Sequence, residues 1–280
     1  MRNNGINRRQ VMLAIAASSV ASGAGAREIL DHGAKVYWTS AGQGSRTLLF
    51  VHGWTCDSTT WAAQVAEFSK RYRVITLDLP GHGRSQQPAG GLYSMAVFAQ
   101  AVEAVRRAAG ADRLVLIGHS MGGPVVRQYA LTYPQHVEAL VMVEGLVQNP
   151  TISAPARPIP ALTGEAGLKL RSDMVEAMFV KDTPPAVRQA VLKIMLGAPE
   201  ATAAGAMDAT QDRSKWSATP VTVPVLGVYA DHSRLSTPVG RGLIYPTMQY
   251  EELPGTGHFL MMEQPEAFNA RLQAFLSSLG

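Results

Sequence analysis

The chain has 280 residues, of which 46% are hydrophobic and 16% are charged. This length suffices for one large domain or two small ones, and the composition excludes a mainly disordered chain. Three of the 25 Lys and Arg residues but none of the 21 Asp and Glu residues lie in positions 1–26, so the remainder carries one net positive charge. No stripe of Lys and Arg is left to neutralise phosphates, and we expect no nucleic-acid partner.

The N-terminal segment has the layout of a secretory signal peptide. Arg2, Arg8 and Arg9 form a basic start, residues 11–20 are mostly apolar, and residues 24–26 (AGA) form a small-residue cleavage site. The apolar stretch is too short to span a membrane, and no later run of 18 apolar residues predicts an anchor. Because the Arg8-Arg9 pair is similar to a bacterial twin-arginine signal, we expect an exported, periplasmic protein whose signal peptide occupies residues 1–26.

Beyond this segment, short apolar runs alternate with helical patterns. The runs are near-continuous, as in parallel strands that are covered on both faces. The apolar runs comprise residues 47–51, 74–77, 114–117, 140–143, 225–229 and, more weakly, 248–253. The helical patterns comprise residues 94–109, 121–133 and 265–279. This alternation predicts an α/β fold with a mainly parallel twisted sheet covered by helices.

The alternation breaks between two of these strands. Residues 150–160 contain four prolines and predict a loop or extended entry segment. Helical patterns follow near residues 164–180 and 184–197, and no strand is evident. We therefore expect a helical cap inserted over a binding pocket. The predicted domains are a cap at 148–220 and a core formed by 27–147 and 221–280.

Residues 118–122 read GHSMG and lie between an apolar strand and a helix. In that context G-x-S-x-G is typical of a nucleophile elbow, in which a strained turn exposes the serine hydroxyl. The central serine, Ser120, is a poor nucleophile without a base. Enzymes with this elbow carry the serine, an acid and a histidine in that chain order, so the partners should lie downstream.

His258 is the candidate base, because it lies on the glycine-rich loop after the last strand. Of the other downstream histidines, His136 ends a helix and His232 directly follows an acid. Asp231 is the candidate acid, because it ends the strand at 225–229, where α/β sites form. Glu144 follows the strand at 140–143 and competes for this role, since its longer side chain could also reach the histidine.

Two backbone N–H groups are candidates for an oxyanion hole. Met121 follows the nucleophile at a helix N-terminus, and Trp54 lies in the loop after the strand at 47–51. His52 precedes the nucleophile and is interpreted as structural. Cys56, the single cysteine, is interpreted as a small buried hydrophobic residue. No cluster of metal-ligating residues is evident, and we expect no metal or organic cofactor.

These motifs together resemble the α/β-hydrolase superfamily. The resemblance is carried by FVHGW, DLPGHGRS, GHSMGG, the YAD strand end and the PGTGHF loop. It runs from about Lys35 to the C-terminus and is weakest over the cap. It implies that the loop at residues 78–83 is structural, and it excludes the members that carry an aspartate nucleophile, since Ser120 stands in that place.

The resulting hypothesis is a serine hydrolase that cleaves a small carboxylic ester or lactone through an acyl-enzyme. Four methionines in the cap and the apolar residues 259–262 suggest an apolar pocket, although core packing explains them equally well. A carbon–carbon bond hydrolase or a perhydrolase with the same triad is the alternative. A non-catalytic ligand-binding protein of this fold is a further alternative. The expected partner is therefore a small acyl substrate.

Overall fold

The computed structural model describes residues 25–31, 33–147, 161–212 and 217–280. Within these residues, eight strands form one sheet in the order β1-β2-β4-β3-β5-β6-β7-β8. The strands are β1 (Gly25–Asp31), β2 (Ala34–Ala41), β3 (Thr47–Val51), β4 (Arg73–Leu77), β5 (Leu114–His119), β6 (Val137–Val143), β7 (Val225–Ala230) and β8 (Met248–Leu253). β2 is antiparallel to both of its neighbours, and β3 to β8 run parallel. The predicted α/β fold with a mainly parallel sheet is thus confirmed.

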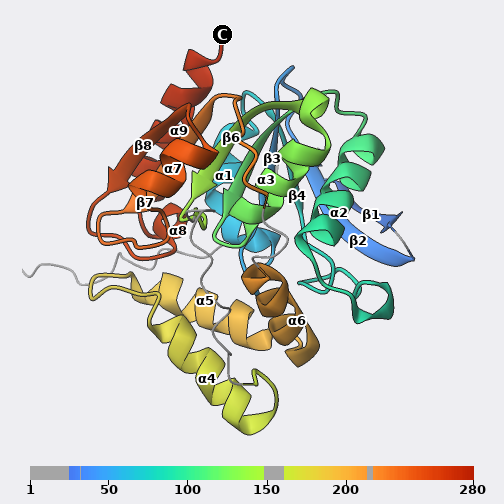
Figure 1. Ribbon diagram of the computed structural model, residues 1–280, viewed down its shortest axis with the longest axis vertical. Helices are drawn as coiled ribbons and strands as arrows, with labels where there is room; N and C mark the ends of the chain where they lie inside the picture. The colour runs from blue at the N-terminus through green and yellow to red at the C-terminus, as the bar shows by residue number, and fades with distance from the viewer. Residues whose placement is uncertain (1–24, 32, 148–160, 213–216) are drawn as a thin grey trace, which may run out of the picture.

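Helices cover both faces of this sheet. The core helices are α1 (Ala62–Phe68), α2 (Met95–Ala109), α3 (Gly122–Thr132), α7 (Pro238–Ile244), α8 (Leu260–Glu263) and α9 (Pro265–Ser278). The chain crosses from β3 through α1 to β4 in one direction along the sheet, and from β5 through α3 to β6 in the other. Right-handed crossovers therefore place α1 and α3 on opposite faces. α9 packs beside α1, and α2 packs beside α3 (Figure 1).

Local sequence signals explain where these elements begin and end. Each residue of β5 is buried, which matches its continuous apolar run. α2 begins after Ser94, whose hydroxyl accepts a hydrogen bond from the Val97 N–H (3.1 Å), and ends at Gly110 with a left-handed φ of 63°. A serine N-cap and a glycine C-cap satisfy groups that the helix itself leaves unpaired.

Three further helices lie outside the sheet and form the described part of the cap. They are α4 (Gly164–Glu176), α5 (Pro185–Gly197) and α6 (Glu200–Gln211). Figure 1 shows them stacked below the carboxyl ends of the parallel strands. α6 is tied to the core by two buried hydrogen bonds, from Thr202 Oγ1 to the Gly81 carbonyl (2.7 Å) and from Trp54 Nε1 to the Ala203 carbonyl (2.8 Å).

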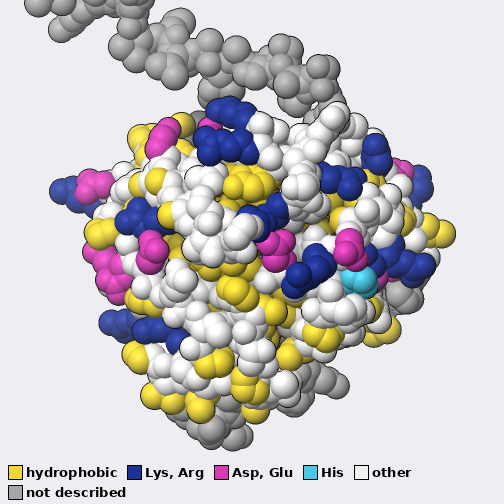
Figure 2. Space-filling view, turned by 90° about the horizontal axis from the view of Figure 1, so that it is seen from above, with side chains coloured by type: hydrophobic (Ala, Val, Ile, Leu, Met, Phe, Trp, Pro, Cys, Tyr) yellow, Lys and Arg dark blue, Asp and Glu magenta, His cyan; other side chains and the backbone are white. Residues whose placement is uncertain are grey.

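Some elements have no counterpart among the apolar runs and helical patterns. β1 exposes most of its residues, and β2 mixes buried with partly buried or exposed positions, so neither forms a continuous apolar run. α6 is rich in alanine and small polar residues, and its apolar periodicity is weak. Within the described ranges, no helix is long and apolar enough to cross a bilayer. Figure 2 shows the end of the molecule opposite the cap, where basic and acidic side chains are interspersed.

Candidate active site

Ser120 occupies a strained turn between β5 and α3. Its φ is 51°, in the left-handed region that non-glycine residues rarely adopt, and its N–H donates to the Val143 carbonyl of β6 (2.9 Å). A Cβ at Gly118 would overlap the Gly122 carbonyl, and a Cβ at Gly122 would overlap the Val51 carbonyl of β3. Both glycines of the motif are therefore needed for this turn, and strain at a single polar residue is typical of a functional site.

His258 lies in the turn between β8 and α8 and is paired with a carboxylate. Its Nδ1 is 3.0 Å from Oε2 of Glu144, and the two side chains are only 11% and 4% exposed. Because Nδ1 donates to the carboxylate, Nε2 keeps its lone pair and can accept a proton. The pair thus has the arrangement of an oriented general base.

Glu144 directly follows β6 and is held rigidly. Its backbone has a φ of 48°, its N–H donates to the Val228 carbonyl (3.0 Å), and its Oε1 accepts from the Ala230 N–H of β7 (2.8 Å). One carboxylate oxygen is bound to the sheet and the other to His258. The carboxylate therefore fixes the orientation of the imidazole relative to the sheet.

The prediction that Asp231 orients His258 is wrong in this structure. Asp231 Oδ1 pairs instead with Nδ1 of its neighbour His232 (3.1 Å), and both side chains are about half exposed. The physical reason is that Glu144, which accepts a hydrogen bond from the Ala230 N–H, takes the buried position beside His258. Chain order could not separate the two acids, because both lie between Ser120 and His258.

The expected oxyanion donors lie on either side of the serine. Met121 is the residue before α3, where a backbone N–H has no acceptor within the helix. Trp54 lies on the loop that follows β3, and a Cβ on the adjacent Gly53 would be 3.1 Å from the Ser120 Cβ. This loop therefore lies directly against the nucleophile elbow, as an oxyanion hole requires, and the role of the two N–H groups stays a prediction.

His52 is structural, as the sequence analysis predicted. Its Nδ1 bonds to the Gly53 carbonyl (2.8 Å), and its Nε2 accepts from the Leu79 N–H (2.9 Å). Complete burial lowers the pKa of His52, so the ring is neutral and braces the loop after β3 against the loop after β4.

Asp78 anchors the second of these loops. Its buried carboxylate accepts hydrogen bonds from the Ser58 N–H (2.9 Å) and from the Arg84 N–H (2.9 Å) and Nε (2.8 Å). Burial alone would raise the pKa of Asp78, but the hydrogen bonds from Arg84 and Ser58 lower it below its usual range. The DLPGHGRS segment thus supports the site without carrying its chemistry.

His119 is a site residue that the sequence analysis missed. Its Nε2 donates to the backbone carbonyl of His258 (2.9 Å), and the two ring centroids are 4.8 Å apart. Burial, and then the charge of His258, hold the pKa of His119 well below its usual range. The G-x-S-x-G pattern treats this position as variable, so nothing in the motif signals that the residue joins the elbow to the loop of the base.

The apolar residues beside the base pack into the core. Phe259, Leu260 and Met261 are completely buried, and Met195 of the cap is 2% exposed. These side chains fill space between α8, the cap and the sheet. For them the core interpretation applies, and they do not demonstrate an acyl pocket.

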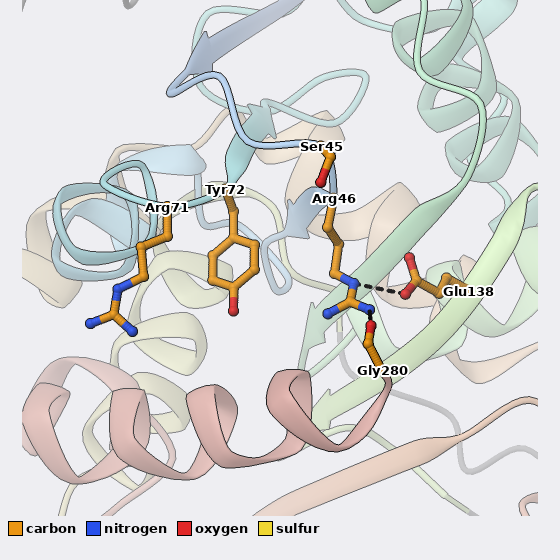
Figure 3. Close-up of a pocket in the computed structure, with 6 residues that line it drawn as sticks. All are labelled: Ser45, Arg46, Arg71, Tyr72, Glu138 and Gly280. Carbon is orange, nitrogen blue, oxygen red and sulfur yellow. Dashed lines mark hydrogen bonds and ion pairs between the residues drawn. The ribbon is translucent and has the colours of Figure 1, made fainter.

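A separate cavity of about 360 Å³ lies at the opposite end of the sheet (Figure 3). Arg46, one of its lining residues, bonds to Glu138 Oε1 (2.7 Å) and to the carbonyls of Leu276 (2.8 Å) and Gly280 (2.7 Å). Its charge is thus already satisfied within the chain. The cavity lies at the amino ends of β3 and β6, away from Ser120 and His258.

Comparison with known proteins accords with this geometry. A family profile described as the alpha/beta hydrolase fold matches residues 46–167. The chain has the α/β-hydrolase fold. The profile spans Ser120 and Glu144, whereas His258 lies beyond it. An uncharacterized protein of Mycobacterium tuberculosis (strain ATCC 25618 / H37Rv) is 28% identical to this chain over 285 residues, which cover 88% of this chain and 80% of that protein.

Solved structures share the fold of this chain over most of its length. An enol-lactonase from Burkholderia xenovorans LB400 superposes with a TM-score of 0.78 at 23% identity, covering 90% of this chain and 100% of the lactonase. A thermophilic esterase from Thermogutta terrifontis superposes with a TM-score of 0.76 at 24% identity, covering 91% of this chain and 99% of the esterase. At these identities the likeness establishes the shared fold.

Proposed function

We propose that the protein is a serine hydrolase that cleaves a small carboxylic ester or lactone. The observation that carries the proposal is the buried Glu144–His258 pair, whose loop is bonded through His119 to the strained elbow at Ser120. Similar folds include an esterase and an enol-lactonase, which supports acyl hydrolysis as the reaction class.

The reaction has two halves. Ser120 Oγ attacks the acyl carbonyl while His258 Nε2 takes its proton, and the resulting oxyanion is stabilised by the N–H groups of Met121 and Trp54. The tetrahedral intermediate expels the alcohol, which leaves with the proton from His258. Water then attacks the acyl-enzyme with His258 again as base, and the carboxylic acid and free Ser120 are released. Glu144 stabilises the imidazolium in both halves.

The first test is hydrolysis of p-nitrophenyl esters, from acetate to octanoate, and of simple lactones by the purified protein. We expect turnover of one or more of these substrates, and a loss of about a thousandfold or more in kcat for Ser120→Ala. Circular dichroism should show that the variant is folded. If folded wild type leaves every ester and lactone intact, acyl hydrolysis of this class is the wrong reaction.

Two alternatives use other chemistry at the same site. A carbon–carbon bond hydrolase would cleave a diketone-type substrate, and a perhydrolase would pass the acyl group to hydrogen peroxide, so product analysis separates them from an esterase. A non-catalytic ligand-binding protein would show no turnover and no effect of Ser120→Ala. The fully hydrogen-bonded Glu144 carboxylate favours catalysis over mere binding, since a binding site has no need of an oriented base.

We further propose that the protein is exported to the periplasm. The proposal rests on Arg8-Arg9 and the apolar stretch at residues 11–20, both of which lie outside the described part of the chain. Replacement of both arginines by lysine should keep the protein out of the periplasmic fraction of the host. Undiminished periplasmic delivery would contradict the twin-arginine route.

A further inference from the structure

The turn between α4 and α5 of the cap lies directly on the loop of the proposed base. The N–H of His258 donates to the Met178 carbonyl of this turn (2.9 Å). A Cβ on the preceding Gly257 would lie 2.7 Å from that same carbonyl and 3.3 Å from the Val180 N. Only glycine leaves room for so close an approach of two backbones. The backbone position of the base is therefore set in part by the cap.

Glu263 reinforces this contact from the core side. Its Oε2 accepts a hydrogen bond from the Gly257 N–H (2.8 Å) and a second from the Thr183 hydroxyl of the cap (3.2 Å). Its Oε1 is buried without a hydrogen-bond partner among the described residues. Burial of a carboxylate oxygen without a hydrogen-bond partner costs free energy of folding. The two hydrogen bonds that Oε2 accepts offset part of this cost and connect the loop to the cap.

Thr183 is the corresponding group on the cap side. Its side chain is buried, and besides donating to Glu263 its hydroxyl accepts the Val180 N–H (3.0 Å), while its own N–H donates to the Val180 carbonyl (3.1 Å). One hydroxyl thus closes the cap turn and links it to the loop of the base. Loss of this hydroxyl would remove the bond that closes the cap turn and the bond that links the turn to Glu263.

We propose that Thr183 and Glu263 are positioning residues for His258, so that the cap turn at residues 177–183 belongs to the catalytic apparatus. The inference rests on the proposed function, in which His258 is the base. His258 is then held by three connections: its side chain by Glu144, its carbonyl by His119, and its N–H together with that of Gly257 by the cap and Glu263. A displacement of the base of about 1 Å can cost roughly a hundredfold in rate.

The test replaces the hydroxyl of Thr183. We expect Thr183→Val to lower kcat for the best p-nitrophenyl ester about tenfold with KM nearly unchanged, and Thr183→Ser to restore most of the rate. Thr210→Val is the matched control, because among the described residues this cap hydroxyl bonds to the Ala206 carbonyl within α6 and to no group of the His258 loop. The control should retain the wild-type kcat. An equal loss in both valine variants would indicate a general effect of cap stability and would overturn the proposal.

A second measurement does not depend on activity. Hydrogen exchange of the peptide that contains Gly257 and His258 should speed up in Thr183→Val and in Glu263→Leu, and should stay slow in Thr210→Val and, for the most part, in Glu263→Gln, which keeps an acceptor oxygen. Unchanged exchange and unchanged kcat in Thr183→Val would overturn the inference while Ser120→Ala still tests the hydrolase. If wild type is inert, the exchange data alone decide whether the cap holds this loop.

Discussion

The two ends of the same parallel strands are built in opposite ways. Among the described residues, non-glycine residues with positive φ are Thr55, Ser120 and Glu144, and each follows a strand at the carboxyl edge. At the amino edge, Arg46 instead ties the starts of β3 and β6 to the end of α9 with favourable bonds. Side-chain hydrogen bonds thus connect elements at both edges, whereas positive φ at non-glycine residues occurs at the carboxyl edge in the described part of the chain.

This difference suggests that the carboxyl edge of the sheet serves function and that the amino edge serves stability. Strained residues persist only where the surrounding structure compels them, and they cluster at sites where a side chain must point in a set direction. At the amino edge, the Arg46 guanidinium instead donates to three acceptors without such strain. Changes at the carboxyl edge should therefore act mainly on rate, and changes at the amino edge mainly on the free energy of unfolding.

The largest change in rate is expected for a substitution of Glu144, at the carboxyl edge. Glu144→Gln keeps the shape of the side chain but removes the charge that stabilises the imidazolium, and kcat should fall about a hundredfold or more. Asp231→Asn is the matched control and should keep kcat within about twofold, because its carboxylate faces solvent. Ester hydrolysis at saturating substrate measures both. The opposite ranking would restore Asp231 as the acid.

At the amino edge, Arg46→Ala should leave kcat unchanged and destabilise the fold. The guanidinium donates to one carboxylate and two carbonyls that would lose their partner, which should cost about 1–3 kcal/mol in the free energy of unfolding. Lys70→Ala, which removes an exposed ion pair with Glu67, should cost less than about 0.5 kcal/mol. Urea unfolding measures both changes. Loss of rate with retained stability in Arg46→Ala would contradict the division between the edges.

The smallest predicted effect concerns acid stability, which should also depend on the carboxyl edge. Burial lowers the pKa of His82 to about 3, whereas an unfolded histidine titrates near 6.5. The unfolded chain therefore binds a proton that the folded chain does not, and stability falls as the pH drops below about 6.5. His82→Phe should reduce the slope of unfolding free energy against pH, between pH 6 and 4.5, by about 1 kcal/mol per unit. An unchanged slope would show that other groups control acid unfolding.

Much of the fold was predictable, because its parallel strands are buried on both faces. β3 and β8 begin and end where the apolar runs predicted, and β4, β5, β6 and β7 extend those runs by one to three residues. The β1–β2 hairpin was not predicted, since a half-exposed edge lacks a continuous apolar run. The strained turn at Ser120 was predictable because glycine spacing and a strand-to-helix transition specify it locally.

The choice of acid was not predictable for a different reason. Glu144 and Asp231 both follow parallel strands, and both satisfy the chain order. Which of them reaches His258 depends on the adjacency of β6 and β7 and on the bond from the Ala230 N–H to Glu144. His119, Thr183 and Glu263 are equally invisible in the sequence, because their partners lie at least 80 residues away along the chain or act through backbone atoms.

The sequence by itself determined the parallel α/β architecture, the elbow at Ser120 and the loop of His258. The periodicity of apolar residues and the spacing of glycines are local properties, encoded by residues a few positions apart. Only the tertiary structure decided that Glu144 pairs with His258, and that His119 and the cap turn bond to the backbone of His258. These contacts join strand ends, loops and cap segments that are far apart in the sequence. They can form only after the parallel strands have paired and their carboxyl ends lie side by side.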